Sequence, residues 1–446
     1  MKNVSVRDYG ARGDGVTKDT AAIQAAIDDC AANGGGQVLF ENGQFVFGLF
    51  RMRSNVELHL EADAVLLGST DLEDFPDLET VFWRTEYAPR YNKKCMIYAE
   101  GCENIAITGR GKIDCRGEYS VQMLPGFEDP ETRPKAFHWP YKRNPYPTDA
   151  PDGMVHLPYV PFPVSPNMSS LTPGRVLLFM GCKGVYVEDV TLANSPSAWG
   201  YWVCDCENVH FARAQVLASP LYPNNDGIHI NCCRNVTISD CNIQAGDDGI
   251  VIRAYSMPLY KHTVCEKIAV TNCNILSHAG AFRLSYYGDG VVRNCAISNI
   301  NITHSNVGVL IVLPDKPVNR GSDEGEEPSL VENCTFSNIT MDTLFHEPIR
   351  IHIGRDVPVD GIRNLYFNNI HARSVCMPAI TGRVGNKVEN VHITNSQFIQ
   401  IDRKTIEDEQ YGPTSYYSAS EDFKSSPRFE HVKNLCLENV VFETLE

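Results

Sequence analysis

The sequence contains no long apolar segment and no excess of positive charge. No apolar run approaches the length of about 20 residues that a membrane-spanning helix needs, and residues 1–15 lack the apolar stretch of a secretion signal. The 446 residues include 55 acidic and 39 basic side chains, so the formal net charge is -16. This charge disfavours binding to nucleic acid or to anionic membrane surfaces. We therefore expect a cytoplasmic protein that binds neither.

The cysteine spacing of a zinc site is also absent. The 16 cysteines form no array of two C-x2-C pairs. A chain of this size does not need the disulfide framework of a small secreted domain. We expect these cysteines to be reduced and mostly buried, as in a cytoplasmic protein.

One phrase is present in many copies, an Asn or Gly followed by alternating apolar residues. Most copies are 24 to 32 residues apart, and short β-branched strands at this period, separated by Asn, Gly and Asp turns, indicate a solenoid. The framework of leucine-rich repeats is missing and a propeller blade needs a longer period, so an all-β, right-handed parallel β-helix fits best. The copies begin at Asn104, Gly184, Asn208, Asn235, Lys267, Asn294, Asn333, Asn364, Asn390 and Asn434. Cysteines that recur within the repeats are expected to stack inside the coil as small apolar residues: Cys232, Cys241, Cys265, Cys273, Cys295 and Cys334.

Residues 17–33 differ from the repeats and predict an amphipathic helix, with Asp19 or Thr20 as its N-cap and a glycine run after it. We expect a single β-helix domain, 1–446, in which residues 1–45 cap the open end of the solenoid. Insertions at 116–174 and 401–430 interrupt the repeats, and such excursions from a rigid scaffold usually form a binding wall or lid. The apolar face of the helix would consist of Ile23, Ala26, Ile27 and Cys30.

Three aspartates in two turns are the strongest functional signal. Asp226 lies in an N-D-G turn, and the pair Asp247 and Asp248 follows within the same stretch, 224–255. Stacked positions of a parallel coil are about 4.8 Å apart, so the three carboxyls can share one surface. Their repulsion raises at least one pKa, and a protonated carboxyl beside an ionised one suits acid/base cleavage of a glycoside. The alternative is that Asp-Gly pairs simply form turns.

With these residues in view, the chain resembles glycoside hydrolase family 28, the polygalacturonase family, as a divergent member. The specific motifs are N-S-P-S-A-W at 194–199, N-N-D-G-I at 224–228 and G-D-D-G-I at 246–250, after an N-terminal segment shared with other β-helix proteins. The resemblance implies hydrolysis with inversion and no metal or organic cofactor. It also implies that Asp247 is the general acid, while Asp226 and Asp248 activate the water. Inversion needs carboxyls about 6.5–9.5 Å apart.

Two departures from the family pattern concern the substrate. The usual G-H-G motif is replaced by a stretch with His278 one place early and Ala279 in the histidine position, and the usual R-I-K place, 308–313, has no basic residue. Arg253 and Arg283 are candidates to bind a uronate carboxylate, or else they neutralise the acidic cluster. The remaining candidate substrate-binding residues are Asn224, His229, His278 and Tyr286.

We therefore predict an inverting glycosidase that acts, from chain ends, on pectin-derived or related galacturonide-like oligosaccharides. A β-helix lyase or epimerase is one alternative. Lyases of this architecture usually need a basic residue, often with calcium, and both the three aspartates and the missing R-I-K motif argue against this alternative. A carbohydrate-binding solenoid without catalysis is the other, although binding alone has no need of three repelling carboxyls.

Overall fold

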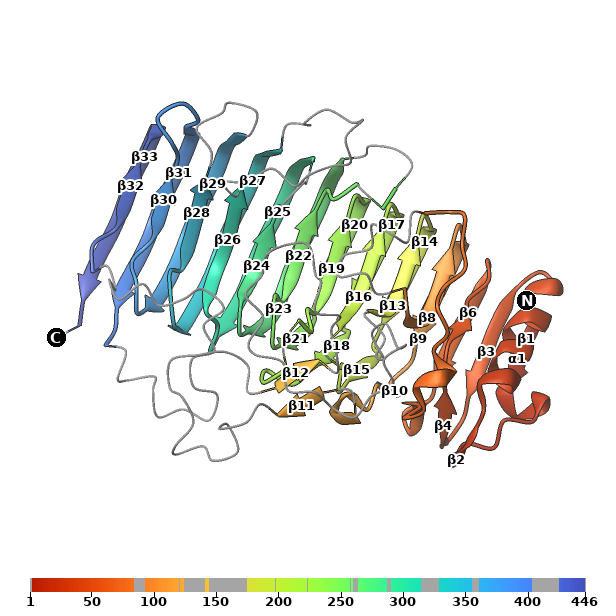
Figure 1. Ribbon diagram of the computed structural model, residues 1–446. Coiled ribbons are helices and arrows are strands. Elements are labelled where there is room, and N and C mark those ends of the chain that lie inside the picture. The colour runs from red at the N-terminus through yellow and green to blue at the C-terminus, as the bar shows by residue number, and fades with distance from the viewer. Residues whose placement is uncertain are drawn as a thin grey trace, which may run out of the picture.

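The computed structural model is a right-handed parallel β-helix in which the chain advances from one end of the solenoid to the other, so that the two termini lie at opposite ends (Figure 1). The structure describes residues 2–83, 93–119, 121–123, 141–143, 175–196, 198–222, 224–256, 258–259, 264–286, 290–313, 329–354, 361–402 and 425–445.

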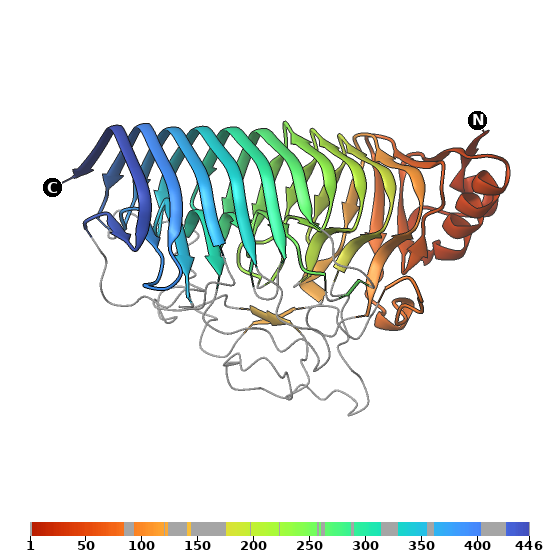
Figure 2. The ribbon, with the colours of Figure 1, turned by 90° about the horizontal axis from the view of Figure 1, so that it is seen from above.

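Two large sheets form the walls of the solenoid (Figures 1 and 2), and the paired strands within them run parallel in the described part of the chain. In the described part of the chain the first, which we call sheet A, has 20 strands and the second, sheet B, has 11. Sheet A contains β1 (Lys2–Ser5), β2 (Asp14–Lys18), β3 (Gly36–Phe40), β4 (Gly43–Phe47), β6 (Val56–Leu60), β7 (Ala64–Gly68), β9 (Glu103–Thr108), β10 (Lys112–Asp114), β14 (Lys183–Glu188), β15 (Thr191–Ala193), β17 (Glu207–Ala212), β18 (Gln215–Leu217), β20 (Arg234–Ser239), β21 (Asn242–Ala245), β23 (Cys265–Ser277), β25 (Val291–Thr303), β27 (Leu330–Leu344), β29 (Gly361–Ser374), β31 (Val388–Gln400) and β33 (Val432–Thr444). Sheet B contains, in spatial order, β5 (Phe50–Arg51), β8 (Cys95–Glu100), β13 (Arg175–Met180), β16 (Trp199–Cys204), β19 (Ile228–Asn231), β22 (Ile250–Arg253), β24 (Gly280–Leu284), β26 (Val307–Leu313), β28 (Ile349–Ile353), β30 (Ala379–Thr381) and β32 (Arg428–Glu430).

The repeated phrase marks the bend at which each coil enters sheet A. Every residue at which a copy begins has a left-handed backbone, with φ between 53° and 71°. Asn tolerates this conformation better than other non-glycine residues, which explains why it recurs. Its side chains also form a ladder on the surface, as in the bonds from Asn390 to Asn364 and from Asn434 to Asn390, both 2.8 Å. The repeats are therefore turns that stack from coil to coil.

The core lies inside the coil, between the two sheets, and consists mainly of β-branched and aromatic side chains. All 16 cysteines are free thiols, and 15 of them are buried. The six that recur within the repeats lie in this core, as predicted. A small, weakly polar side chain packs well there because each coil adds one layer to a narrow stack.

Helix α1 (Thr20–Ala32) lies at the N-terminal end of the solenoid, against β1, β3, β5 and β6 (Figure 1). Its buried residues are the four expected from the sequence. Asp19 is the N-cap but makes no side-chain cap bond, because its carboxylate accepts the amides of Arg12 and Gly13 over 2.8 and 3.0 Å. Short 3-10 helices lie at η1 (Val6–Tyr9), η2 (Leu72–Asp74) and η5 (Gly117–Tyr119). None of the helices in the described ranges is long and apolar enough to cross a membrane.

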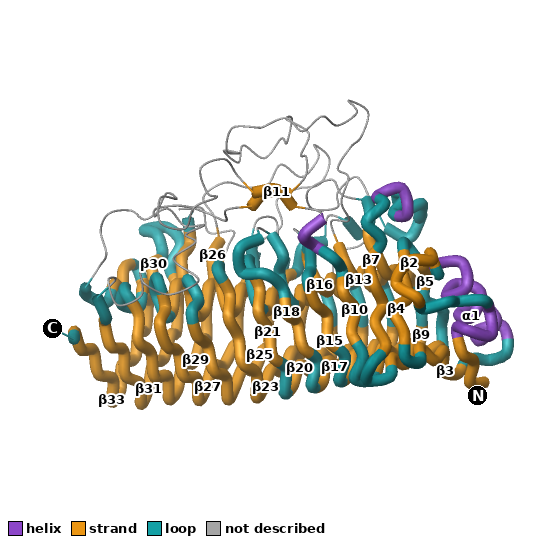
Figure 3. The backbone as a smooth tube through the Cα atoms, turned by 90° about the horizontal axis from the view of Figure 1, so that it is seen from below, coloured by secondary structure: helices purple, strands orange, loops and turns teal. Residues whose placement is uncertain are grey.

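The predicted insertions are described only in part. Within 116–174 the structure shows η5 and the antiparallel pair β11 (Val121–Met123) and β12 (Tyr141–Arg143). Figures 2 and 3 place this pair outside the coils, on one long side of the solenoid. Residues 124–140 and 144–174, and 403–424 of the second insertion, lie outside the described residues. The expected wall or lid therefore stays a prediction.

Candidate active site

Asp226 and Asp248 lie level with one another on neighbouring coils, each just before a strand of sheet B. The register pairs Ile228 on β19 with Ile250 on β22, so the positions two residues earlier are also side by side. The amide of Gly227 donates to the carbonyl of Asp248 over 2.9 Å, which joins the two turns directly. Neighbouring strands are about 4.8 Å apart, so the two acidic turns form one continuous surface.

Side-chain hydrogen bonds hold these turns in place. Asn225 donates through Nδ2 to the carbonyl of Ser219 over 2.8 Å, and its Oδ1 accepts the amide of Gly246 over 2.6 Å. Only glycine fits at position 246, since a Cβ there would lie 2.2 Å from a backbone carbonyl oxygen. From the next coil, Ser277 Oγ donates to the carbonyl of Asp247 over 2.6 Å. The scaffold therefore fixes the backbone of both acidic turns.

The three carboxyls are buried close together: Asp226, Asp247 and Asp248 are 4%, 7% and 4% exposed. Burial and the charges of Asp247 and Asp248 raise the pKa of Asp226 well above its usual range. Burial also raises the pKa of Asp248. Groups that interact this strongly titrate as a cluster. The cluster therefore retains a proton to a higher pH than an isolated aspartate does.

Contacts with hydrogen-bond donors differ among the three carboxyls. Asp248 Oδ1 accepts the amide of Gly280 over 2.9 Å, and its Oδ2 lies 2.5 Å from Arg283 Nε. Asp247 Oδ1 accepts the amide of Asp248 over 3.0 Å. The Oδ1 atom of Asp226 has no hydrogen-bond partner among the described residues. Donors stabilise the ionised form of a carboxyl, so the protein supports an anion at Asp248 more strongly than at Asp226.

Two arginines and two tyrosines cluster on the coils of β22 and β24, next to the acidic turns. The guanidinium of Arg283 is 4.7 Å from the centre of the Tyr286 ring. The guanidinium of Arg253 is 5.1 Å from the ring of Tyr255 and 5.5 Å from that of Tyr286. Both arginines are buried. Guanidinium groups bind carboxylates well, so this part of the site is suited to an anionic sugar.

The two candidate histidines are both buried and neutral. His229 stacks on Trp199, with ring centres 4.0 Å apart, and its Nδ1 lies 3.3 Å from Asp226 Oδ2. Burial and the charges of nearby arginines lower the pKa of His229 well below its usual range. His278 is completely buried, and burial lowers its pKa to about 4. The structure thus places Nδ1 of His229 beside an acidic side chain of the site.

Asn224 shapes the first acidic turn through its backbone, and the position where the family usually has a basic residue lies in the core. Asn224 is buried and has a φ of 58°, a left-handed conformation that opens the first acidic turn. Leu310 occupies the place where a basic residue is missing from the sequence, and it is fully buried. Its partners in the register are Arg283 on one side and Arg350 on the other. Basic side chains are therefore present one coil before and one coil after that place.

Sequence reasoning missed Arg175, Asn225 and Ser277. Arg175 pairs in register with Trp199, the last residue of the N-S-P-S-A-W motif, and its guanidinium lies 3.7 Å from the centre of that ring. Nothing in the local sequence around 175 marks it as part of a site. The conspicuous N-N-D-G turn could have indicated Asn225, but the two adjacent asparagines are alike in sequence.

No group of three or more His, Cys, Asp or Glu side chains in the described ranges is arranged to hold a metal ion.

The fold and the site together define a class of protein, the parallel β-helix proteins that carry three buried aspartates on adjacent coils. The profile of "Glycosyl hydrolases family 28" matches residues 165–415, which include both acidic turns and make up more than half of the chain. The chain belongs to glycosyl hydrolases family 28. Residues 3–56 match a second profile, "Rhamnogalacturonase A/epimerase, pectate lyase-like".

Individual relatives are distant. A probable polygalacturonase of Vitis vinifera is 25% identical over 323 residues, which cover 69% of this chain and 56% of the relative. The exo-poly-alpha-D-galacturonosidase of Dickeya chrysanthemi is 28% identical over 325 residues, 69% of this chain and 51% of the relative. The chain thus spans about half the length of these curated relatives. The solved exopolygalacturonase from Thermotoga maritima has a TM-score of 0.68 at 23% identity, with 90% of this chain and 87% of that one covered, which shows the shared fold.

Proposed function

We propose that this protein is an inverting glycoside hydrolase that removes galacturonide units from the ends of pectin-derived or related oligosaccharides. The observation that carries the proposal is the convergence of three buried aspartates, one of them with a strongly raised pKa, on two adjacent coils. The buried cation of Arg253 nearby supports an anionic substrate. Two relatives named polygalacturonase and exo-poly-alpha-D-galacturonosidase support the substrate class, and the second name supports attack from chain ends.

In the proposed reaction Asp247 gives its proton to the glycosidic oxygen as the bond between that oxygen and the anomeric carbon breaks. A water molecule attacks the same carbon from the opposite face and forms the new bond, while Asp226 and Asp248 take up its proton. One proton is given and one is received, and the configuration of the anomeric carbon is inverted. The leaving sugar departs as a neutral alcohol.

The two arginines have separate roles in this proposal. Arg283 holds Asp248 as an anion through the ion pair of 2.5 Å. Arg253 binds the uronate carboxylate of the substrate, with the rings of Tyr255 and Tyr286 beside it. A guanidinium can pair with a carboxylate through two parallel hydrogen bonds, which supplies the orientation that a bound uronide needs.

Digestion of galacturonide oligosaccharides of defined length tests the proposal. The monomer should appear from the first time point, with the remaining chains shortened one unit at a time. Asp226→Asn, Asp247→Asn and Asp248→Asn should each abolish this release without loss of the fold. Unsaturated products would indicate a lyase, and binding without any product would indicate a carbohydrate-binding solenoid. Either result would overturn the proposal.

A reducing compartment such as the cytoplasm is the setting that we propose. All 16 cysteines are free thiols, and thiols in such number persist where disulfides are kept reduced. In that setting short oligosaccharides are the more accessible substrates, since polymers do not cross membranes.

A further inference from the structure

Arg175 is buried beside the indole of Trp199, and one strand, β16, separates it from the coil of the first acidic turn. It is 1% exposed, and burial of a guanidinium is costly unless other groups stabilise the charge. Its Cζ lies 3.7 Å from the centre of the Trp199 ring and 4.6 Å from that of Trp202. These distances are well within the range of cation–π attraction. The two indoles therefore help to hold a positive charge inside sheet B.

Trp199 lies between Arg175 and His229. The strand order sets β16 between β13 and β19, so the two neighbours approach the indole from opposite coils. The imidazole of His229 stacks on the indole at 4.0 Å with an angle of 26° between the planes. Its Nδ1 is 3.3 Å from Asp226 Oδ2. Guanidinium, indole, imidazole and carboxyl thus follow one another across three strands.

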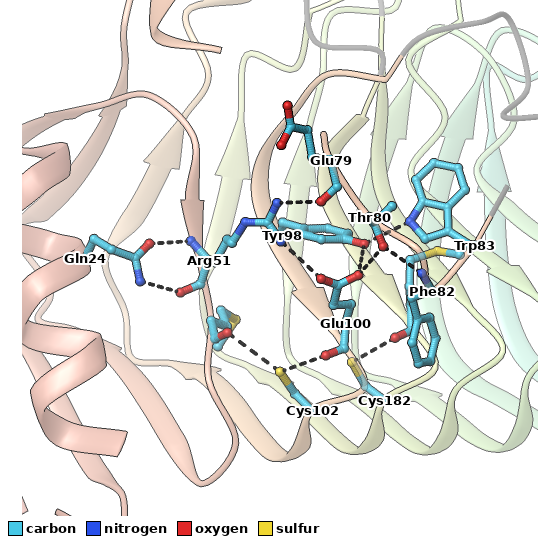
Figure 4. Close-up of polar contacts among 12 residues, drawn as sticks. Gln24, Arg51, Glu79, Thr80, Phe82, Trp83, Tyr98, Glu100, Cys102 and Cys182 are labelled. Carbon is cyan, nitrogen blue, oxygen red and sulfur yellow. Dashed lines mark hydrogen bonds and ion pairs between the residues drawn. The ribbon is translucent and has the colours of Figure 1, made fainter. Parts of the chain in front are cut away.

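Residues from earlier coils fix the far side of this arrangement. Trp202 meets Trp83 edge to face, with centres 6.1 Å apart and an angle of 86°. Trp83 Nε1 donates to the hydroxyl of Tyr98, which donates to Glu100, both over 2.8 Å (Figure 4). Arg51 Nη1 lies 3.1 Å from Glu100 Oε1 in the same cluster. Trp202 is therefore supported against movement away from Arg175.

We propose that Arg175, Trp199 and His229 form one stack that positions the carboxyl of Asp226, so that Arg175 is a positioning residue of the active site. The inference rests on the proposed function, in which Asp226 takes up a proton from water. An imidazole held flat against an indole has little freedom to turn, so it presents Nδ1 to Asp226 in one orientation. Arg175 holds the indole of Trp199 in place, and the indole in turn fixes the orientation of the imidazole.

Charge gives Arg175 a second effect on Asp226. Burial and two neighbouring carboxyls raise the pKa of Asp226, and the charges of Arg283 and Arg175 oppose this rise. Arg175 also helps to lower the pKa of His229, which keeps the imidazole neutral. The charged and titratable groups around Asp226 are Asp247 and Asp248 from the turn before β22, His229 on β19, Arg253 on β22, Arg283 on β24 and Arg175 on β13.

Arg175→Met and Arg175→Lys test the inference through the pH dependence of kcat/KM. Without the cation the pKa of Asp226 rises further, so the acid limb of the profile should move to higher pH. We expect kcat to fall roughly 10- to 100-fold, the effect of a small misplacement of a reacting group. Lysine keeps the charge and should restore the limb, with only part of kcat recovered. An Arg175→Met profile lowered by one factor at every pH, with the limb in place, would overturn the inference.

Arg293→Met is the matched charge control. Arg293 lies on β25 in sheet A, where its Nε is 2.7 Å from Glu266 Oε2, and its loss should leave the acid limb unchanged. Titration of aspartate carboxyls by ¹³C NMR gives a second test that needs no substrate. The Asp226 signal is identified by its absence in Asp226→Asn. A higher titration midpoint of Asp226 in Arg175→Met would support the inference even if the protein hydrolysed no galacturonide. An unchanged midpoint would overturn the inference, even if the protein does hydrolyse galacturonides.

Trp199→Phe covers the case in which Arg175→Met does not fold. Phenylalanine keeps an aromatic face for the core but shortens the surface shared by Arg175 and His229. We expect a lower kcat and an acid limb at higher pH. Wild-type kcat and an unmoved limb in this variant would contradict a positioning role for the stack.

Discussion

Asp248 and Arg283 form a buried ion pair between neighbouring coils, with Oδ2 and Nε 2.5 Å apart. Burial raises the pKa of Asp248, and Arg283 and the amide of Gly280 oppose that rise. The pair therefore stabilises an anion where the proposed mechanism needs a base. Arg283 therefore acts on Asp248 directly, whereas the guanidinium of Arg253 lies beside the rings of Tyr255 and Tyr286.

Arg283→Met should lose activity toward uronides and neutral glycosides alike, since it leaves Asp248 without its cation. Removal of one partner of a buried pair commonly costs about 3–5 kcal/mol of stability. Arg253→Met should weaken only uronides, mainly as a higher KM. Kinetics of both variants on a matched uronide and neutral glycoside measure the difference. Arg293→Met serves as the control, and equal selectivity of the two site variants would contradict the separate roles.

Asp247→Asn should lower turnover of an oligogalacturonide by about 10²–10⁴-fold, the usual contribution of general acid catalysis. The loss should shrink for an activated aryl glycoside, whose leaving group departs without a proton. Asp226→Asn and Asp248→Asn should show no such rescue, because both act on the water. Steady-state kinetics on the two substrates decide the matter. The same loss on both substrates for all three variants would refute the assignment of the acid.

Asp226→Asn should raise thermal stability at neutral pH. The pKa of Asp226 is raised in the folded protein well above that of a free aspartate. The protonated carboxyl therefore contributes its full stabilisation only below the unfolded-state pKa of about 3.9. This contribution is lost as the pH rises through the folded-state pKa. The amide carries no charge at any pH, so the variant should gain roughly 0.5–2 kcal/mol at pH 7. The gain should shrink toward pH 4.

Thermal unfolding across that pH range measures the gain. Asp63→Asn, at an exposed turn, is the control and should change little at any pH. A destabilised Asp226→Asn with no dependence on pH would show that the carboxyl is not held under electrostatic strain.

Asn225→Ala should misplace the acidic turns while the solenoid stays folded. The substitution removes the bonds to Ser219 and Gly246, at a cost of about 1–3 kcal/mol for polar groups left without partners. We expect kcat to fall about 10²-fold, as for other small displacements of catalytic groups. Asn242→Ala removes one exposed hydrogen bond, which the side-chain amide of Asn274 donates to Asn242 Oδ1. This variant should keep nearly full activity. Equal activity in the two variants would show that Asn225 does not order the site.

The fold was accessible from the sequence because a parallel coil converts distance along the chain into position in space. Repeat starts such as Asn235 and Asn364 mark left-handed turns, and the chemistry of asparagine explains both the pattern and the structure. The aspartates were found for the same reason: Asp226 and Asp248 are separated by one coil, and the register of β19 and β22 brings them together.

Other parts of the site depend on geometry that one sequence does not reveal. Arg175 reaches the site only because β13 pairs with β16 after a long insertion. Asn224 and Asn225 are adjacent and identical in type, but Asn224 has the left-handed backbone and Asn225 makes the bond to Gly246 that joins the two turns. Whether Arg283 serves the substrate or Asp248 depends on a side-chain direction.

The anomeric configuration of the first product tests the central claim most directly. Proton NMR of an α-linked oligogalacturonide, the linkage in the name of the Dickeya relative, can follow the released sugar before mutarotation. If one aspartate acts as the general acid and the other two activate the water, the β anomer should appear first, together with the shortened chain. Initial release of the α anomer, or no release at all, would contradict the account.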